Sequence, residues 1–236
     1  MNRGSRQKLT PIQAWQRTPR DGSVRVTEIR TVRDDPGCVW IVLDGVRAGL
    51  VDRETAAKAG LALDQPAWTE SLAARLDAEV RRRLCDRGAV RLLASRMRSR
   101  SGLIEALVRR GHDAETAGVC ADAYAERGAI DDARFAEVVV RNELARKPAG
   151  RRFLEAKLYA KGVRGVHAGR AIEEALGQRS ELEDARKVAA SAARSIRDGT
   201  EPDAFRRRLS GRLARRGFSG GVIRRVVDEL LRERRS

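Results

Sequence analysis

The sequence predicts a mainly α-helical fold, an elongated array of three tandem three-helix repeats preceded by a small antiparallel β-rich N-terminal module. Three observations predict it. The nine-residue pattern L-x-x-x-L-x-x-[K/R]-G occurs three times, at Leu103–Gly111, Leu154–Gly162 and Leu209–Gly217. A β-branched stretch with turn signals precedes the first copy. Apolar residues make up 42% of the chain but aromatic residues only 4%, a composition typical of Leu- and Ala-rich helices with thin interfaces.

The first 62 residues predict an arm followed by the β-rich module. Residues 1–22 are polar and are expected to form a flexible arm. Residues 23–62 are expected to form a three-stranded meander and a short helix that Asp52 caps and Gly60 ends. The strands and turns are predicted, in order, at Val24–Val32, the turn Asp34–Gly37, Cys38–Leu43, the hairpin turn Asp44–Gly45 and Val46–Val51.

The nine-residue pattern describes one helix and its end. Leucines four residues apart form one apolar stripe, the basic residue complements the helix dipole, and Gly111, Gly162 or Gly217 supplies a left-handed stop. Helices are predicted before the three copies, at Val90–Met97, Ala133–Leu144 and Asp184–Ile196, and further apolar-periodic segments follow near Asp113, Gly165 and Ser219.

The unit is therefore three helices in about 50 residues, and such a unit buries too little surface to be stable alone. We expect neighbouring units to stack into an elongated, monomeric array. The predicted boundaries are residues 63–128 for a linking helix and the first repeat, 129–178 for the second and 179–236 for the third.

The stretch AIDDARFAE (Ala129–Glu137) contains two adjacent carboxylates, Asp131 and Asp132, that could bind a metal or begin a helix. Adjacent side chains on a helix point about 100° apart, so the two carboxylates do not converge on one ion. The structural interpretation is favoured: Asp131 caps the helix, Asp132 lies in its first turn, and Phe135 and Val139 carry the apolar stripe, as Leu154 and Leu158 do in the next helix.

No other residues form a catalytic constellation. His112 and His167 have no ligand or triad partner at a suitable spacing, and Ser99 and Ser101 are N-cap candidates before Leu103. The three cysteines lack metal-like spacing and predict reduced thiols in a cytoplasmic protein. We expect no enzyme activity, no catalytic residue, no metal, no cofactor and no membrane span.

The net charge of +16 predicts a polyanionic partner. Residues 203–236 alone hold eleven Arg against four acidic residues. For any single Arg a solvated helix face is the better explanation, but the ensemble lacks balancing acids. Because aromatic residues are scarce, contact with single-stranded DNA would be mainly to phosphate, with weak sequence preference. The candidate residues are Arg96, Arg98, Arg109, Arg110, Arg151, Arg152, Lys157, Lys161, Arg206, Arg207, Arg208, Arg212, Arg215 and Arg216.

The order of the motifs resembles the bacterial RecX family. The resemblance is carried by the three repeats, by RMRS (Arg96–Ser99), and by AIDDARFAE followed by ARKPAGRRFLEAKLYAKG (Ala145–Gly162), and it covers roughly residues 24–233. The sequence departs from the family pattern at Gly102, where a Glu is common, at Ala129, where an aromatic is common, and in a longer third repeat.

The resemblance implies a non-enzymatic regulator of the recombinase RecA. Members of the family lodge along the groove of the RecA–single-stranded-DNA filament, and they usually limit filament growth, strand exchange and ATP hydrolysis. The alternative is a general nucleic-acid-binding helical repeat protein that acts without RecA. A nuclease that depends on Asp131 and Asp132 is the weakest hypothesis.

The cap interpretation of Asp131 predicts how its variants behave. Asp131→Asn should change the free energy of unfolding little, because Asn caps helices as well as Asp does, whereas Asp131→Ala should cost about 1 kcal/mol. Urea unfolding of the two variants measures the difference. A metal-dependent nuclease activity that either change abolished would contradict the interpretation.

Overall fold

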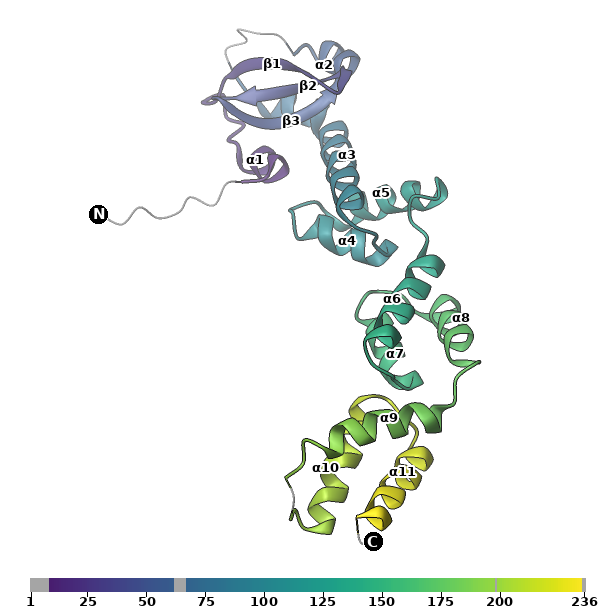
Figure 1. The fold of residues 1–236 in the computed structure, drawn as a ribbon. Helices are drawn as coiled ribbons and strands as arrows, with labels where there is room; N and C mark the ends of the chain where they lie inside the picture. Colours follow the sequence, from purple (N-terminus) through teal and green to yellow (C-terminus); the bar gives the residue numbers. More distant parts are fainter. Residues whose placement is uncertain (1–8, 62–66, 198, 235–236) are drawn as a thin grey trace, which may run out of the picture. The chain divides into compact units, whose positions relative to one another are not determined.

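The computed structural model describes residues 9–61, 67–197 and 199–234, and these residues form eleven helices and one three-stranded sheet (Figure 1). The chain divides into two compact units, unit 1 (Met1–Ile130) and unit 2 (Asp131–Ser236). Unit 1 holds the sheet and the first five helices, the last of which ends the first repeat. Unit 2 holds the remaining six helices, which form the second and third three-helix repeats.

The predicted antiparallel meander is confirmed. The strands β1 (Val26–Val32), β2 (Asp35–Leu43) and β3 (Val46–Asp52) pair in the order β1-β2-β3. Asp44 and Gly45 form the hairpin turn with φ values of 44° and 77°, as a two-residue hairpin with its right-handed twist requires. The turn predicted at Asp34–Gly37 is wrong, because Val32 pairs with Asp35 and leaves only two residues for the loop.

The predicted flexible arm is wrong for the part of residues 1–22 that the structure describes from Leu9 onward. Pro11–Arg17 forms helix α1, which Thr10 and Gln13 begin with a reciprocal capping box. Trp15 is buried and meets Trp68 edge-on, with the ring centroids 5.1 Å apart. The sequence signal is weak because a seven-residue helix shows less than two turns of apolar periodicity.

After the sheet come the short helix α2 (Arg53–Lys58) and the long helix α3 (Glu70–Ser95). Asp52 stands at the N-cap position of α2 but makes no side-chain cap; its carboxylate instead accepts hydrogen bonds from Arg83 and Cys38. The helix predicted at Val90–Met97 is the end of α3, which stops at Ser95.

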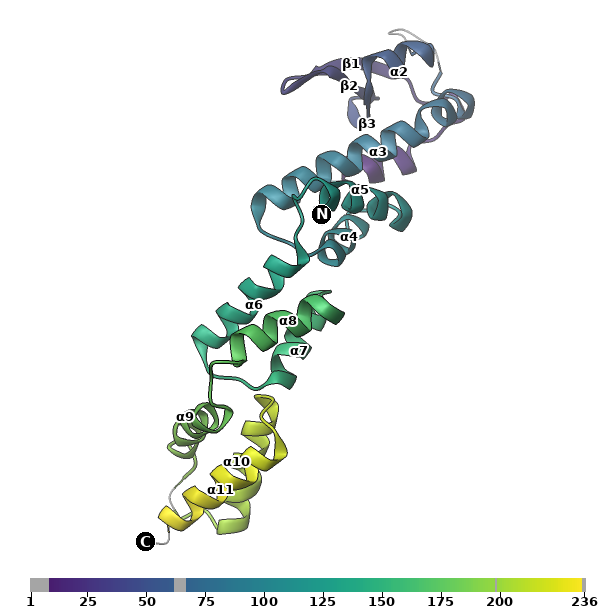
Figure 2. The same ribbon diagram turned by 90° about the vertical axis from the view of Figure 1, so that its right-hand side faces the viewer.

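Helix α3 belongs to two cores. It lies beside the sheet at one end and beside the first repeat at the other (Figure 2). Its buried residues in the sheet core are Leu72, Ala73, Leu76, Val80 and Leu84. Its buried residues in the first-repeat core are Cys85, Ala89 and Leu92. One rigid helix therefore joins the β-rich module to the first repeat.

The predicted three-helix repeats are confirmed. The remaining helices are α4 (Arg100–Val108), α5 (Ala114–Glu126), α6 (Asp132–Arg146), α7 (Arg151–Tyr159), α8 (Gly165–Leu176), α9 (Glu181–Ala193), α10 (Pro202–Arg215) and α11 (Gly220–Glu233). All six leucines of the nine-residue patterns have 0% exposure. The glycines that end these patterns, Gly111, Gly162 and Gly217, have φ values of 101°, 77° and 78°, in the left-handed region.

The helix caps follow the sequence closely. Asp131 caps α6 by accepting a hydrogen bond of 2.9 Å from the Arg134 backbone N–H, and Asp132 lies in the first turn. Ser99 caps α4 through the Gly102 backbone N–H, while Ser101 lies inside the helix and is no cap. Phe135 is only half-buried; Val139 and its neighbours Ala136 and Val140 are the residues of α6 that enter the core.

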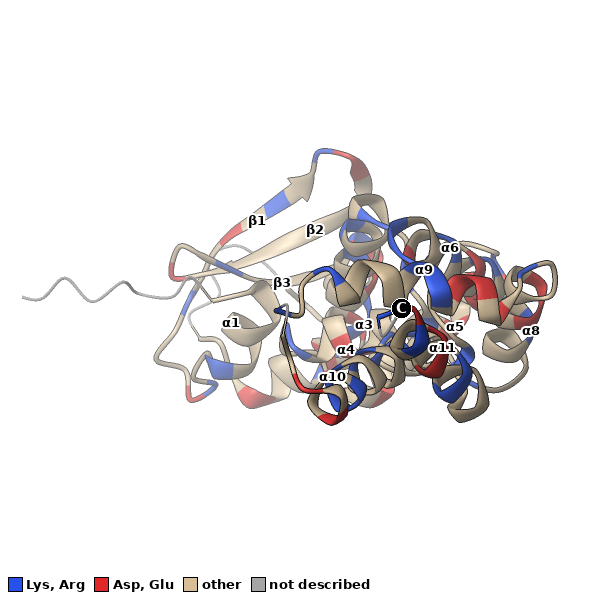
Figure 3. Cartoon of the chain, turned by 60° about the horizontal axis from the view of Figure 1, so that its bottom comes forward, with Lys and Arg blue, Asp and Glu red and all other residues tan. Residues whose placement is uncertain are grey.

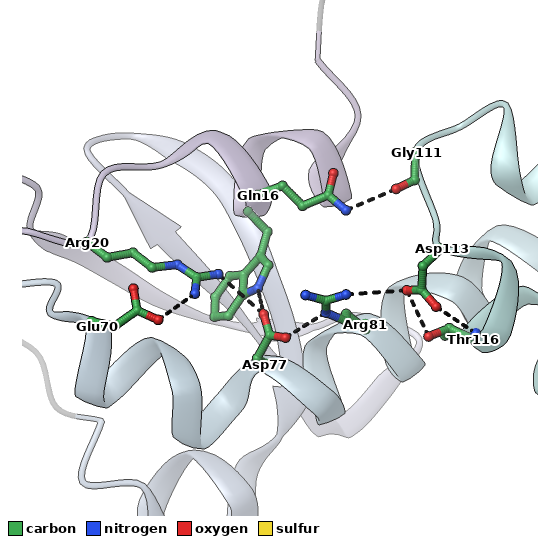
Figure 4. A network of polar contacts seen from close by, with 9 residues as sticks. Gln16, Arg20, Glu70, Asp77, Arg81, Gly111, Asp113 and Thr116 are labelled. Carbon is green, nitrogen blue, oxygen red and sulfur yellow. Dashed lines mark hydrogen bonds and ion pairs between the residues drawn. The ribbon is translucent and has the colours of Figure 1, made fainter.

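The Asp77 carboxylate ties α1 to α3 and to the first repeat (Figure 4). It accepts hydrogen bonds of 2.8 Å from Trp15 Nε1 and 2.6 Å from Arg81 Nε, and lies 3.3 Å from the Arg20 guanidinium. Arg81 also reaches Asp113, at 3.6 Å, and Asp113 caps α5. Partial burial raises the pKa of Asp77, but its hydrogen bonds and the two arginines lower it further, so that the pKa lies below its ordinary 3.8.

This arrangement predicts acid-sensitive stability of unit 1. The ionised Asp77 stabilises the fold fully above its ordinary pKa, and the contribution is lost as the pH falls through the lower pKa of the folded state. Asp77→Asn should lower the unfolding midpoint at pH 7 and reduce its dependence on pH below 4. Tryptophan fluorescence reports it, because Trp15, Trp40 and Trp68 are the chain's three tryptophans and all lie in unit 1.

Asp34→Asn is the matched control, since Asp34 lies exposed in a turn and makes no ion pair with any described residue. Equal midpoints for Asp77→Asn and Asp34→Asn at pH 7 would contradict the assigned role of Asp77.

Candidate functional site

Basic and acidic residues alternate along most helices, so the positive charge is not one uniform surface (Figure 3). Four of the predicted basic candidates have carboxylate partners. Arg109 lies 3.7 Å from Glu105, Arg151 lies 3.4 Å from Glu173, Lys157 lies 4.0 Å from Glu143, and Arg206 lies 2.7 Å from Asp228. Most of these side chains are exposed, so the pairs contribute little to stability and remain able to exchange partners.

Four candidates flank α4. Arg96 and Arg98 lie between the end of α3 and the start of α4, and Arg109 and Arg110 follow the end of α4. Arg98 is half-buried and donates a hydrogen bond of 3.2 Å to the Leu92 carbonyl oxygen. Burial lowers the pKa of Arg98, and repulsion from Arg96, Arg110 and Arg109 lowers it further. Arg96, Arg109 and Arg110 therefore lie close enough to repel the charge of Arg98, and these four residues are all the predicted candidates of unit 1.

A second group of candidates is exposed in unit 2. Arg152 on α7 and Arg207, Arg208 and Arg215 on α10 are exposed and make no ion pair with any described residue. Lys161 is also exposed, at the end of the second-repeat pattern. These side chains are the ones in unit 2 best placed to contact phosphate groups.

Two candidates at the C-terminal end of α10, Arg212 and Arg216, bind backbone carbonyl groups of neighbouring segments. Arg212 donates a hydrogen bond of 2.9 Å to the Ala192 carbonyl oxygen and another to Ser195 Oγ, which ties α10 to the end of α9. Arg216 donates two hydrogen bonds, of 3.0 and 2.8 Å, to the Pro148 carbonyl oxygen, and its guanidinium lies 4.1 Å from the centroid of the Phe153 ring. Arg216 therefore joins the third repeat to the second, and its prediction as a residue that faces RecA or DNA stays a prediction.

The backbones of the two repeats touch at the same place. The Gly150 N–H donates a hydrogen bond of 2.9 Å to the Arg216 carbonyl oxygen. A Cβ atom on Gly150 would collide with the carbonyl of Gly217, and one on Gly217 with the backbone of Phe153. Gly217 is thus required twice, for the left-handed turn that ends the pattern and for this close approach.

The acidic pair of α6 is engaged in local structure. The Asp131 carboxylate accepts the capping hydrogen bond from the Arg134 backbone N–H. Among residues 9–61, 67–197 and 199–234, no group of three or more His, Cys, Asp or Glu side chains could hold a metal. The expected absence of metal, cofactor and catalysis stays a prediction. Within the same residues, no helix is both long enough and apolar enough to span a membrane.

His112 is more deeply buried than its predicted loop position indicates. His112 lies in the loop after Gly111, as predicted, but it is only 7% exposed, whereas His167 is exposed on α8. Burial lowers the pKa of His112; the charge of Asp113 opposes this shift and that of Arg110 adds to it.

The predicted free thiols are confirmed for Cys38, Cys85 and Cys120.

Comparison with known proteins gives a consistent result. Residues 131–176 match the family model described as RecX, second three-helix domain, and residues 180–227 match RecX, third three-helix domain. The chain is similar to the regulatory protein RecX of Streptomyces coelicolor, with 36% identity over 61% of this chain and 76% of that protein. It is 33% identical to the regulatory protein RecX of Mycobacterium tuberculosis, over 66% of this chain and 89% of that protein.

A solved crystal structure of a regulatory protein RecX shares the fold. It has a TM-score of 0.59, and the match covers 87% of this chain and 99% of that one at 22% sequence identity.

The contacts of Arg216 with the second repeat predict that its replacement destabilises unit 2 more than replacement of the exposed Arg215 does. Arg216→Ala should destabilise unit 2 by about 1–3 kcal/mol, because the Pro148 carbonyl loses its charged donors within the interface. Arg215→Ala, an exposed control one residue away, should stay within about 0.5 kcal/mol. Hydrogen exchange of the α7 and α10 amides measures both variants. Equal protection in the two would show that Arg216 does not join the repeats.

Proposed function

Because this chain belongs to the RecX family of regulatory proteins, we propose that it regulates the recombinase RecA. In this proposal it binds as a monomer along the groove of the RecA–single-stranded-DNA filament, in the cytoplasm, and inhibits filament growth, strand exchange and ATP hydrolysis. It acts by binding and carries no catalytic site of its own.

The observation that carries the proposal is the order of the modules. Residues 131–176 and 180–227, in the second and third three-helix repeats, match the family models. The regulatory proteins RecX of Streptomyces coelicolor and Thermobifida fusca are similar over 76% of their length. A series of small, linked repeats offers several separate surfaces, so that one chain can contact successive filament subunits. Which repeat contacts RecA and which contacts DNA stays open in this proposal.

The exposed arginines support a DNA contribution. Arg152, Arg207, Arg208 and Arg215 have no carboxylate partner among the described residues, so binding a phosphate does not require an ion pair to break first. Phosphate contacts of this kind give affinity and salt dependence but little sequence preference. The same observation favours the second candidate function, a general nucleic-acid-binding repeat protein that acts without RecA.

ATP hydrolysis by RecA separates the two functions. With single-stranded DNA in excess, so that competition for DNA is negligible, this protein should strongly reduce RecA's DNA-dependent hydrolysis at far less than one molecule per RecA. An effect at that ratio requires action on the filament, since one bound molecule must influence many subunits. No change until the protein coats the DNA would leave only the general DNA-binding function.

A double variant, Arg207→Gln with Arg208→Gln, provides the control for direct DNA contact. It removes two positive charges and breaks no described ion pair. If both residues contact phosphate, the slope of log affinity for naked single strands against log salt should become shallower by about 1.4. Regulation of hydrolysis that survives this change does not depend on phosphate contacts of Arg207 and Arg208.

A further inference from the structure

A cavity of about 170 Å³ lies in unit 1 where α1, β2, α3 and the turn between α4 and α5 meet. It is lined by Thr10, Pro11 and Ile12 from the first segment, Trp40 from the sheet, and residues of α3 and the turn. Sites for drug-sized ligands measure about 300–1,000 Å³, so this cavity suits a small ion or water.

The charge of this cavity sets it apart. Arg87, Arg91 and Arg110 line it, and no Asp or Glu is among its lining residues. None of the three arginines makes an ion pair with a described residue. Three other cavities in the described parts of the chain each carry at least two carboxylates in their lining. Here the positive charge is concentrated and unbalanced.

Two buried polar atoms at this cavity also lack partners. Within the described residues, neither His112 Nδ1 nor Arg87 Nε has a hydrogen-bond partner, although both atoms are buried. His112 as a whole is 7% exposed. Leaving a buried polar group unpaired destabilises a fold, so native proteins rarely leave two such groups at one place without a ligand or ordered water. A bound anion would also neutralise the charge of the three arginines, which water cannot do.

Trp40 limits what else can bind. Its side chain is buried, and the guanidinium groups of Arg87 and Arg47 lie 5.5 and 5.9 Å from its ring centroid. Because Trp40 is only 6% exposed, its ring offers no open surface on which a base could stack. The cavity can recognise charge and oxygen acceptors but not a nucleobase.

The walls of the cavity are fixed by α1. Thr10 Oγ1 donates a hydrogen bond of 3.0 Å to the Arg110 carbonyl oxygen, and Gln16 Nε2 donates one of 3.1 Å to the Gly111 carbonyl oxygen. These bonds hold the turn that carries Arg110 and His112 against the N-terminal helix. Two carboxylates adjoin lining residues in sequence, and both are engaged elsewhere. Asp113 accepts from the Thr116 backbone N–H and hydroxyl at 2.8 and 2.9 Å, and Asp86 accepts from the Tyr124 hydroxyl at 2.8 Å.

We propose that this cavity binds a single phosphate group in its dianionic form. Guanidinium groups match a phosphate bidentately, and a tetrahedral dianion offers enough oxygens for three arginines and an imidazole, whereas a carboxylate offers two oxygens and one charge. The phosphate is either free phosphate or the terminal phosphate of a nucleic-acid strand, because internal phosphodiesters carry only one charge. The site does not depend on regulation of RecA.

Binding of inorganic phosphate to the full chain tests the proposal. Calorimetry at constant ionic strength, with chloride as the balancing anion, should show one site. The double variant Arg91→Gln with Arg110→Gln changes two exposed rim residues and should bind about tenfold more weakly or worse. Arg75→Gln, an exposed residue of α3 outside the cavity, is the control and should bind like the wild type.

The two histidines give a second readout that needs no variant. The ring signals of His112 should shift as phosphate is added, while those of exposed His167 should not. Absence of binding, equal binding by all three proteins, or equal shifts of both histidines would each overturn the proposal.

Binding of single strands with and without a 5′-phosphate distinguishes a strand terminus from free phosphate as the ligand. If a 5′-phosphorylated single strand binds the wild type more tightly than its unphosphorylated counterpart, and the rim variant loses that difference, the site takes a strand terminus. If phosphate binds but the two strands do not differ, the site takes free phosphate.

Discussion

The carboxylate of Asp77 is the point on which unit 1 depends. It receives Trp15 from α1, Arg20 from the following segment and Arg81 from its own helix, and Arg81 passes the connection on to Asp113 at the start of α5. Because α3 also contributes to two apolar cores, the sheet, the N-terminal helix and the first repeat are all joined through this one helix. The walls of the phosphate cavity come from all of these parts, so its geometry exists only when they are joined.

In unit 2 the repeats are joined by a close approach of their backbones and by one half-buried arginine, Arg216. Each repeat has its own small core, and the two cores are linked where Gly150 and Gly217 meet and Arg216 covers Phe153. Arginine thus has three different roles in this chain. It joins repeats at Arg216, concentrates charge around Arg98, and remains exposed without a partner at positions such as Arg207.

This division of roles bears on how a regulator of this kind would work. Exposed, unpaired arginines contribute a weak and sequence-independent attraction to any polyanion. Recognition of one particular partner needs groups held in a defined geometry, and such groups lie at the junctions between elements, where packing fixes them. A basic net charge therefore explains attraction to polyanions but does not select one partner among them.

The sequence by itself determined the helices of the three repeats and most of their ends. The paired leucines, the glycine stops and the caps at Ser99 and Asp131 involve residues no more than four or five positions apart, so local chemistry specifies them. Only the tertiary structure decided that α1 is packed, that Arg216 faces inward, and that His112 and Arg87 meet at one cavity. Those outcomes rest on contacts such as Trp15–Asp77, Arg216–Pro148 and Thr10–Arg110, which join residues 62, 68 and 100 positions apart. No periodicity along a single chain records such pairs, because they are set by how finished elements pack against one another.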